Sequence, residues 1–251
     1  PSKNADLLPA YQSRYKRGSV WGSVPNAEEC RAIELMLAPE MWHGRKVLDI
    51  GCGAGCLTAR LWNYGAQVKG IDYCQEAIDI AGQYFHLPGV TFDCKDFKQE
   101  TERYDVVVSQ GTFEHFDDPY GAMDFVFDNL LNAPGVFIFS TPNLINPRGY
   151  LWILLECILD ERVDSLDLHR LWVDDIKNYA KTRWSNLQMA TCDFNWGNGQ
   201  RLITNIQNHP KFQKVLNSTT LDALSFQLSK TLPHDEPGRM NGATLICRLD
   251  K

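Results

Sequence analysis

The sequence predicts an α/β fold built on a doubly wound, mostly parallel sheet of seven strands. Apolar runs of strand length alternate with helical patterns, and glycine-rich or acidic turns follow several of the apolar runs. Open α/β sheets bind ligands at the carboxyl ends of their strands. The same pattern therefore predicts a small-molecule site along that edge of the sheet.

The first strand and the turn after it carry the most specific motif. The apolar run 47–50 contains Asp49, and Gly51, Gly53 and Gly55 follow at alternate positions before a helix expected over 56–64. Glycine has no Cβ, so it permits both the required dihedrals and a close approach of ligand to backbone. The free N–H groups of the helix start are directed at the same place. The alternative interpretation is an ordinary tight turn between a strand and a helix.

The spacing of the glycines discriminates between ligands. A dinucleotide fingerprint places its third glycine or alanine three residues after the second, and that position is Cys56 in this chain. The carboxylate of Asp49 would repel a pyrophosphate but can pair with a cationic ligand. These residues disfavour NAD or NADP, and an NAD(P)-dependent oxidoreductase is kept as the alternative from another reaction class.

Acidic residues also lie at or near the ends of the next two strands. The run 67–72 predicts a second strand that ends in Asp72, directly before Tyr73. In nucleoside-binding sheets, an acid at this point accepts hydrogen bonds from the ribose hydroxyls. A short strand is expected at 90–94, close to two further acids, Asp93 and Asp96.

The fourth strand is a nearly continuous apolar run, as expected for a buried parallel strand. The run 104–110 ends in Gln110, and Glu114 and His115 follow shortly afterwards. The rest of the fold is expected to comprise helices at 118–131 and 173–184 and strands at 136–140, 187–194 and 243–249.

Taken together, these motifs resemble a known enzyme family. The run Asp49-x-Gly51-x-Gly53-x-Gly55 resembles motif I of the class I S-adenosylmethionine-dependent methyltransferases. The Glu114-His115 pair and the run 140–143 resemble the small-molecule O-methyltransferases of ubiquinone biosynthesis. The resemblance covers about residues 45–145. It implies a Rossmann-like sheet whose last strand is antiparallel, with S-adenosylmethionine as cofactor and S-adenosylhomocysteine as product.

The resemblance also implies a set of cofactor-binding residues. Asp96 is expected to receive the adenine amino group because it follows its strand, with Asp93 as the alternative, and Phe97 is expected to flank the ring. The full expected set is Asp49, Gly51, Gly53, Gly55, Asp72, Tyr73, Asp96, Phe97 and Gln110.

Catalysis is expected at the edge that follows the fourth strand. An oxygen acceptor must lose a proton, and His115 is the candidate general base because imidazole titrates near neutral pH. A side chain that only binds loop backbone is the alternative interpretation of His115. Glu114 can orient His115, bind the acceptor or cap the loop, and His169 is a second catalytic candidate.

Metal-independent transfer is expected. Some members of the resembled group place another acid three residues before the equivalent of Glu114 and hold a divalent metal there. In this chain that position is Gly111, and the two remaining ligands seldom suffice for tight binding.

Segments outside the cofactor core are expected to determine the acceptor. Residues 1–40 form an N-terminal lid or helical segment, with a helix at about 26–37 that begins at Asn26. The methyltransferase domain spans 41–251, with acceptor-side insertions at about 144–172 and 195–240 that contain helices near 149–159 and 221–228. Tyr11, Tyr15 and Trp21 are candidate lid residues, or else aromatics that anchor a terminal arm.

Composition excludes several classes of protein. The net charge of −6 over 251 residues argues against a nucleic-acid partner. No apolar run reaches the length of a membrane span, and the eight scattered cysteines predict free thiols in a cytoplasmic protein. A homodimer contact is expected around 152–159. The sequence thus predicts O-methylation of a small molecule, with an N-methyltransferase or a non-catalytic methyltransferase-like binding protein as alternatives.

Overall fold

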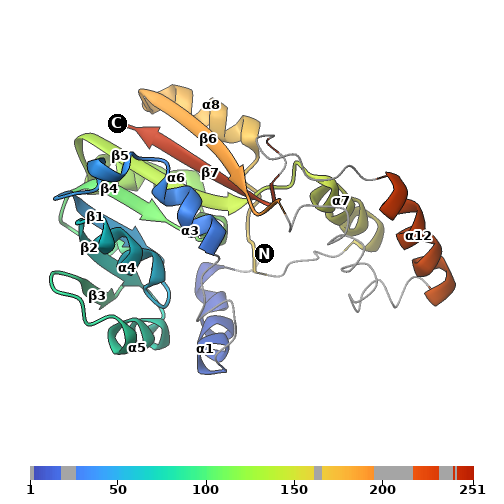
Figure 1. Cartoon of the computed structure of the whole chain (residues 1–251), viewed down its shortest axis with the longest axis horizontal. Helices are drawn as coiled ribbons and strands as arrows, with labels where there is room; N and C mark the ends of the chain where they lie inside the picture. The colour runs from blue at the N-terminus through green and yellow to red at the C-terminus, as the bar shows by residue number, and fades with distance from the viewer. Residues whose placement is uncertain (1–2, 18–26, 161–165, 195–216, 232–239, 241) are drawn as a thin grey trace. The chain divides into compact units, whose positions relative to one another are not determined.

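The computed structural model of the chain describes residues 3–17, 27–160, 166–194, 217–231, 240 and 242–251. Seven strands form one sheet in the order β3-β2-β1-β4-β5-β7-β6 (Figure 1). The strands are β1 (Lys46–Ile50), β2 (Gln67–Asp72), β3 (Thr91–Cys94), β4 (Tyr104–Ser109), β5 (Leu131–Pro142), β6 (Asn186–Cys192) and β7 (Thr244–Asp250). The predicted fold class is confirmed.

Strand direction also follows the expectation. β1 pairs in parallel with β2 and β4, β2 pairs in parallel with β3, and β4 pairs in parallel with β5. β7 lies between β5 and β6, and Figure 1 shows it running opposite to both neighbours. The order reverses beside β1, so the carboxyl ends of β1, β2 and β4 meet at the switch point where such sheets bind ligands.

The helices that accompany the sheet match most of the expected ones. They are α1 (Leu8–Lys16), α3 (Ala27–Glu34), α4 (Cys56–Asn63), α5 (Gln75–Tyr84), α6 (Pro119–Phe125), which continues as the π-helical turn η5 (Val126–Leu130), and α8 (Val173–Arg183). Four 3-10 turns join them: η1 (Asn4–Leu7), η2 (Pro39–Met41), η3 (Phe97–Gln99) and η4 (Phe113–His115). The sequence analysis did not predict α1 or α5. Trp21 and Asn26 lie outside the described residues.

Two compact units divide the chain. The first comprises residues 1–141, 166–190 and 246–251 and contains most of the sheet; the second comprises 142–165 and 191–245. The second unit contains α7 (Pro147–Leu159) and α12 (Ser218–Thr231), close to the helices expected there. Within this unit, the side-chain amides of Asn143 and Asn146 both donate to the carbonyl oxygen of Gly242, at 2.7 and 3.3 Å.

The core of the first unit is apolar on both faces of the sheet. Leu48 of β1, Val107 of β4 and Phe137 of β5 are completely buried. A strand of a parallel sheet is covered on both sides by helices, which is why the run 104–109 reads as almost continuously apolar. This burial fixes the ends of the strands, and therefore the loops that follow them, in place.

Two further properties of the described residues concern the length of their helices and the state of their cysteines. No helix among them is long and apolar enough to cross a membrane. The eight cysteines all have free thiols, in agreement with the absence of any Cys-x-x-Cys spacing in the sequence.

Candidate functional site

The glycine turn between β1 and α4 is held to the end of β2. Gly51, Gly53 and Gly55 all adopt positive φ, at 71°, 53° and 81°. The amide of Gly53 donates to Oδ2 of Asp72 at 3.0 Å, and the amide of Cys74 donates to Oδ1 at 2.8 Å. Each carboxylate oxygen has a second lone pair, so Asp72 can bind a ligand while it shapes the turn.

The turn has no room for side chains. A Cβ on Gly51 would collide with the side chain of Thr112. A Cβ on Gly55 would lie 2.8 Å from the Phe92 ring. Both clashes are closer than real Cβ contacts, and positive φ adds strain for any other residue. The glycine spacing therefore reflects tight packing of the turn against β3 and the loop after β4.

Asp49 is the next-to-last residue of β1, just before this turn, and it is completely buried. Its Oδ2 accepts a hydrogen bond from Thr58 Oγ1 at 2.6 Å, whereas Oδ1 has no partner among the described residues. Burial raises the pKa of Asp49 to about 7, because the charged form loses its hydration, and the nearby Asp72 charge adds to the effect. A cation near this carboxylate would be stabilised.

Helix α1 brings two tyrosines to the same edge. The Tyr15 hydroxyl lies 2.8 Å from the position that a Cβ on Gly53 would occupy. The Tyr11 ring packs edge-on against Tyr73 and against His115, with centroid distances of 6.1 and 5.9 Å. Burial raises the pKa of both α1 tyrosines. Both therefore act as neutral hydroxyls.

The two acids after β3 have different surroundings. Asp93 forms ion pairs with Lys69 at 3.1 Å and Lys95 at 3.6 Å. Asp96 is exposed, and its Oδ1 accepts a hydrogen bond from the amide of Lys98 at 2.8 Å. Asp96 therefore caps the turn η3, while Asp93 belongs to a cluster of charges.

Phe97 is buried, and its ring stacks on Phe116 with a centroid distance of 4.9 Å. It also meets Phe125 edge-on at 5.6 Å. The residue expected to flank the adenine ring thus belongs to an aromatic cluster that supports the loop after β4.

Gln110 connects the end of β4 to helix α3. Its Nε2 donates to Glu29 Oε2 at 2.9 Å, and its Oε1 accepts from the Cys30 thiol at 3.3 Å. The Ser140 hydroxyl at the end of β5 donates to the other oxygen of Glu29 and accepts from the amide of Gly111 at 2.9 Å. Glu29 therefore joins the ends of two strands, and it is a residue that the sequence analysis did not single out.

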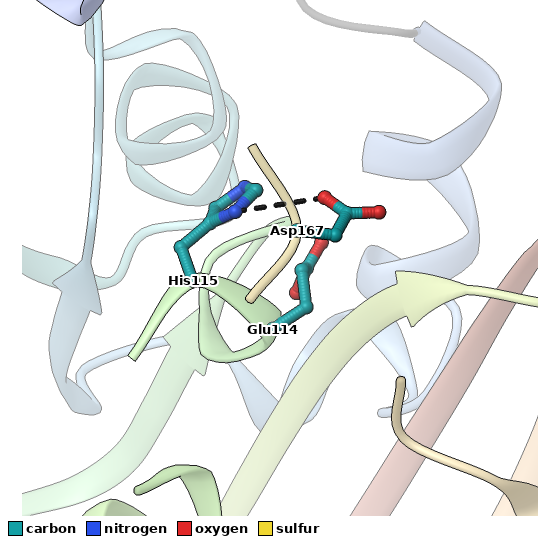
Figure 2. Close-up of side chains that lie close together, drawn as sticks. All are labelled: Glu114, His115 and Asp167. Atoms are coloured by element: carbon teal, nitrogen blue, oxygen red, sulfur yellow. Dashed lines mark ion pairs between the residues drawn. The ribbon is translucent and has the colours of Figure 1, made fainter. Parts of the chain in front are cut away.

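A cluster of three titratable side chains lies beyond the end of β4. Figure 2 shows Glu114, His115 and Asp167 close together. His115 Nδ1 lies 3.5 Å from Asp167 Oδ1 and 2.9 Å from the Leu166 carbonyl oxygen. Each of the three residues has one potential metal-ligand atom within 4.8 Å of those of the other two. These distances would allow the three to share one cation.

Glu114 is the most deeply buried member of the cluster, with 3% exposure. Its Oε2 has no hydrogen-bond partner among the described residues. Burial raises the pKa of Glu114 well above its usual value, and the neighbouring Asp167 charge raises it further. Both effects favour the protonated form of Glu114.

Comparison with known proteins agrees with this geometry. A family model described as a methyltransferase domain matches residues 48–139, from β1 to β5. Residues 48–139 are thus similar to a methyltransferase domain. Within that range lie the glycine turn, Asp72, Gln110 and the Glu114-His115 pair.

Curated relatives align with this methyltransferase domain. A ubiquinone biosynthesis O-methyltransferase from Actinobacillus pleuropneumoniae is 36% identical over 122 residues, which cover 45% of this chain and 51% of the relative. A malonyl-[acyl-carrier protein] O-methyltransferase from Bacillus cytotoxicus is 29% identical over 139 residues, covering 52% of this chain and 48% of the relative. The chain thus spans about half the length of the curated relatives that it matches.

Solved methyltransferase structures share the fold. A phosphoethanolamine N-methyltransferase from Haemonchus contortus, in complex with S-adenosyl-L-methionine, has a TM-score of 0.63 and 16% identity, covering 100% of this chain and 60% of that one. The N-methyltransferase NodS from Bradyrhizobium japonicum has a TM-score of 0.59 and 13% identity, covering 98% of each chain. At this identity the likeness establishes the fold alone.

His169, the second catalytic candidate, makes backbone contacts beside the methyltransferase domain. Its amide donates to the Glu114 carbonyl oxygen at 2.9 Å, and its Nε2 lies 2.9 Å from the Asp117 carbonyl oxygen. These contacts hold the segment that begins at Leu166 against the loop after β4. His169, still a catalytic candidate, is thereby held next to Glu114.

The sequence analysis did not identify Asp167 as a site residue. The signal that identifies it is structural: it belongs to a segment that returns from outside residues 48–139 to the end of β4. Asp72, Gln110, Glu114 and His115, by contrast, were predicted at the strand ends where the structure has them.

Proposed function

We propose that the chain transfers a methyl group from S-adenosylmethionine to an oxygen atom of a small molecule. The observation that carries the proposal is the glycine turn, which is hydrogen-bonded to Asp72 and lies at the same sheet edge as Glu114 and His115. The turn provides close backbone approach, Asp72 provides acceptors for a ribose, and the carboxyl group of Asp49 suits a ligand that carries cationic groups.

The proposed cofactor set is the expected one: Asp49, Gly51, Gly53, Gly55, Asp72, Tyr73, Asp96, Phe97 and Gln110. Asp96 supports this role by its exposure next to η3, whereas Asp93 is engaged with Lys69 and Lys95. Tyr15 is an additional candidate because its hydroxyl lies over Gly53. We propose that α1 and the other described residues before 41 form a lid, in which Tyr11 faces the acceptor side beside His115.

Methyl transfer requires alignment more than activation, because a sulfonium is already a good leaving group. The acceptor oxygen attacks the methyl carbon, the carbon–sulfur bond breaks, and its electron pair stays on sulfur. A hydroxyl acceptor must also lose its proton, and His115 is the candidate base. We favour an oxygen acceptor over a nitrogen acceptor for two reasons. The candidate base His115 lies just after the carboxyl end of β4, and the curated relatives are named O-methyltransferases.

The remaining proposals concern the surroundings of the reaction. We propose a small-molecule acceptor, since a net charge of −6 gives little attraction for nucleic acid. A cytoplasmic location suits the free thiols. For a homodimer contact, the exposed apolar side chains of Tyr150, Leu154 and Ile158 on α7 are the candidates.

A thermal-shift comparison tests the cofactor. S-adenosylmethionine and S-adenosylhomocysteine at 100 times their dissociation constants should stabilise the protein by about 2.7 kcal/mol, a rise of a few degrees in Tm. NAD and NADP should give no shift. In Asp72→Ala the shift should disappear, because the ribose acceptors are lost. An Asp79→Ala protein serves as the control, since Asp79 is an exposed acid on α5.

A shift with NAD or NADP instead would contradict the proposed cofactor. Loss of the shift in Asp72→Ala is informative only if that protein remains folded, because Asp72 also holds the glycine turn. Its circular-dichroism spectrum and unliganded Tm provide that check.

His115→Ala tests the acceptor atom. Turnover of a hydroxyl acceptor should fall by about 100-fold or more, because general-base catalysis contributes a factor of that size. An amine acceptor, which can react in its neutral form, should be far less affected. Unchanged turnover of a hydroxyl acceptor would contradict the role of His115 as a base.

A further inference from the structure

The segment that begins at Leu166 is fixed against the loop after β4 at three points. The Leu166 carbonyl contacts His115 Nδ1 at 2.9 Å, the His169 amide donates to the Glu114 carbonyl oxygen at 2.9 Å, and His169 Nε2 lies 2.9 Å from the Asp117 carbonyl oxygen. Asp167 lies between these contacts. Its carboxylate is therefore held beside His115 by the backbone of its own segment.

The contact with Leu166 fixes the position of the proton on His115. A carbonyl oxygen can only accept a hydrogen bond, so Nδ1 must carry the proton when it contacts Leu166 at 2.9 Å. The neutral imidazole then keeps its lone pair on Nε2, and Nε2 is the basic atom. In Figure 2 the dashed line joins the Nδ1 atom of His115 to the carboxyl group of Asp167.

We propose that Asp167 is a positioning residue for His115: its carboxylate, together with the Leu166 carbonyl, holds the imidazole with its proton on Nδ1 and stabilises the imidazolium that forms when Nε2 takes a proton. This inference rests on the proposed function for its catalytic meaning. The arrangement of His115 and Asp167 can nevertheless be measured without any acceptor.

The groups around His115 support this assignment of charge. Glu114 is 3% exposed, so burial favours its neutral form. The Asp167 side chain keeps 24% exposure, and its Oδ1 lies 3.5 Å from Nδ1. Of the two carboxyl groups, Asp167 therefore loses less hydration as an anion. The Tyr11 ring, which packs on His115 from α1, is neutral, and the Asp117 carboxylate accepts from the amide of Asn4 at 2.7 Å. Asp167 is thus the anion directed at the ring.

The reaction step balances with these groups alone. The acceptor hydroxyl gives its proton to His115 Nε2, its oxygen forms a bond to the methyl carbon, and the carbon–sulfur bond breaks with its electron pair on sulfur. His115 becomes imidazolium, and its new positive charge is paired with the Asp167 carboxylate. The proton leaves to solvent after the product dissociates.

A shared metal ion is the competing interpretation of the same cluster. The three ligand atoms lie within 4.8 Å of one another, and ligands of one ion lie at most about 4–5 Å apart. The proton on Nδ1 argues against it, because a protonated ring nitrogen cannot bind a metal and Nδ1 is the atom that lies 3.5 Å from the Asp167 carboxyl group.

An NMR titration of the full chain tests the proposal. In protein labelled with ¹⁵N-histidine, His115 of the wild type should show the tautomer with a proton on Nδ1, with His115→Ala used to assign its signals. In Asp167→Asn the pKa of His115 should fall by about one unit or more, because a negative charge next to the ring is lost. Asp174 is an exposed acid on α8 and serves as the control. In Asp174→Asn the pKa of His115 should not change.

Three results would overturn the proposal. A proton on Nε2 in the wild type would do so without any variant. A His115 pKa in folded Asp167→Asn equal to that in Asp174→Asn would do so as well. If added Mn²⁺ broadened the His115 signals of the wild type but not of Asp167→Asn, the cluster would be a metal site.

Turnover provides a second measurement that separates this proposal from the function. Asp167→Asn should lower kcat about 10-fold to 100-fold and leave KM for S-adenosylmethionine unchanged. It should also move the acidic limb of the pH profile, which reports the pKa of the general base, to lower pH. Asp167→Glu should recover part of kcat. A confirmed pKa shift in a protein without methyl transfer would support the role of Asp167 and contradict the proposed function.

Discussion

Asp49 has its carboxyl group in the core of the sheet, where water cannot solvate a charge. Its folded-state pKa of about 7 lies above its usual value of 3.8. Because the pKa is raised on folding, the protonated form of Asp49 is favoured in the folded state. As far as Asp49 is concerned, the fold therefore keeps its full stability below about pH 4 and loses part of it as the pH rises to about 7. One buried acid thus makes the whole fold sensitive to pH in that window.

Asp49→Asn should therefore stabilise the protein increasingly between pH 4 and pH 7. A pKa shift of about three units corresponds to a gain of at most about 4 kcal/mol in the free energy of unfolding at pH 7. The Asn side chain keeps an oxygen that can accept the hydrogen bond from Thr58. Urea unfolding at several pH values measures the effect, with Asp79→Asn as the exposed control. A difference from the wild type that does not grow with pH would show that Asp49 ionises freely in the fold.

At the scale of elements, helix α1 is expected to affect the affinity for the cofactor, because it brings Tyr15 next to the glycine turn. The Tyr15 hydroxyl lies 2.8 Å from the Cβ position of Gly53, directly over the turn. Tyr15→Phe should weaken the binding of S-adenosylmethionine by about 5-fold to 13-fold, since one hydrogen bond contributes about 1–1.5 kcal/mol. Isothermal titration calorimetry measures the affinity.

Tyr84→Phe is the matched control for this helix, because Tyr84 is 71% exposed at the end of α5. Equal affinities of Tyr15→Phe, the control and the wild type would mean that α1 is an arm anchored by its aromatic residues. A selective loss in Tyr15→Phe would support the lid.

At the scale of the whole molecule, the sheet depends on an aromatic core behind the site. The Phe137 ring on β5 is fully buried, with centroids 5.1 Å from Phe113 and 5.2 Å from Phe139. Phe137→Ala should lower the free energy of unfolding by about 3–5 kcal/mol, because it removes a large side chain and leaves a cavity. Urea denaturation followed by tryptophan fluorescence measures this loss.

The exposed Phe226 on α12 offers the comparison, since a side chain with 55% exposure has little burial to lose. Phe226→Ala should change the free energy of unfolding by less than about 0.5 kcal/mol. A comparable loss in both variants would mean that Phe137 does not lie in the core of the cooperative unit.

Local patterns in the sequence predicted most of the sheet. The predicted strand 67–72 matches β2, and the expected helix at 56–64 differs from α4 by one residue. Such elements follow from hydrophobic period and turn chemistry, which act over a few residues. The expected strand at 136–140 is longer in the structure, Leu131–Pro142, because pairing with β4 extends it beyond its apolar centre. Helix α1 has few apolar residues in a periodic pattern, so its sequence gave no helical signal.

The sequence by itself determined the glycine turn, the acid at the end of β2 and the Glu114-His115 pair, because each is a short motif attached to one strand end. Tertiary structure alone decided which other side chains meet them. Gln110 binds Glu29, 81 residues away, and His115 contacts Leu166 at a separation of 51 residues. A parallel sheet gathers the carboxyl ends of its strands at one edge whatever their distance along the chain, so no local pattern could have paired Asp167 with His115.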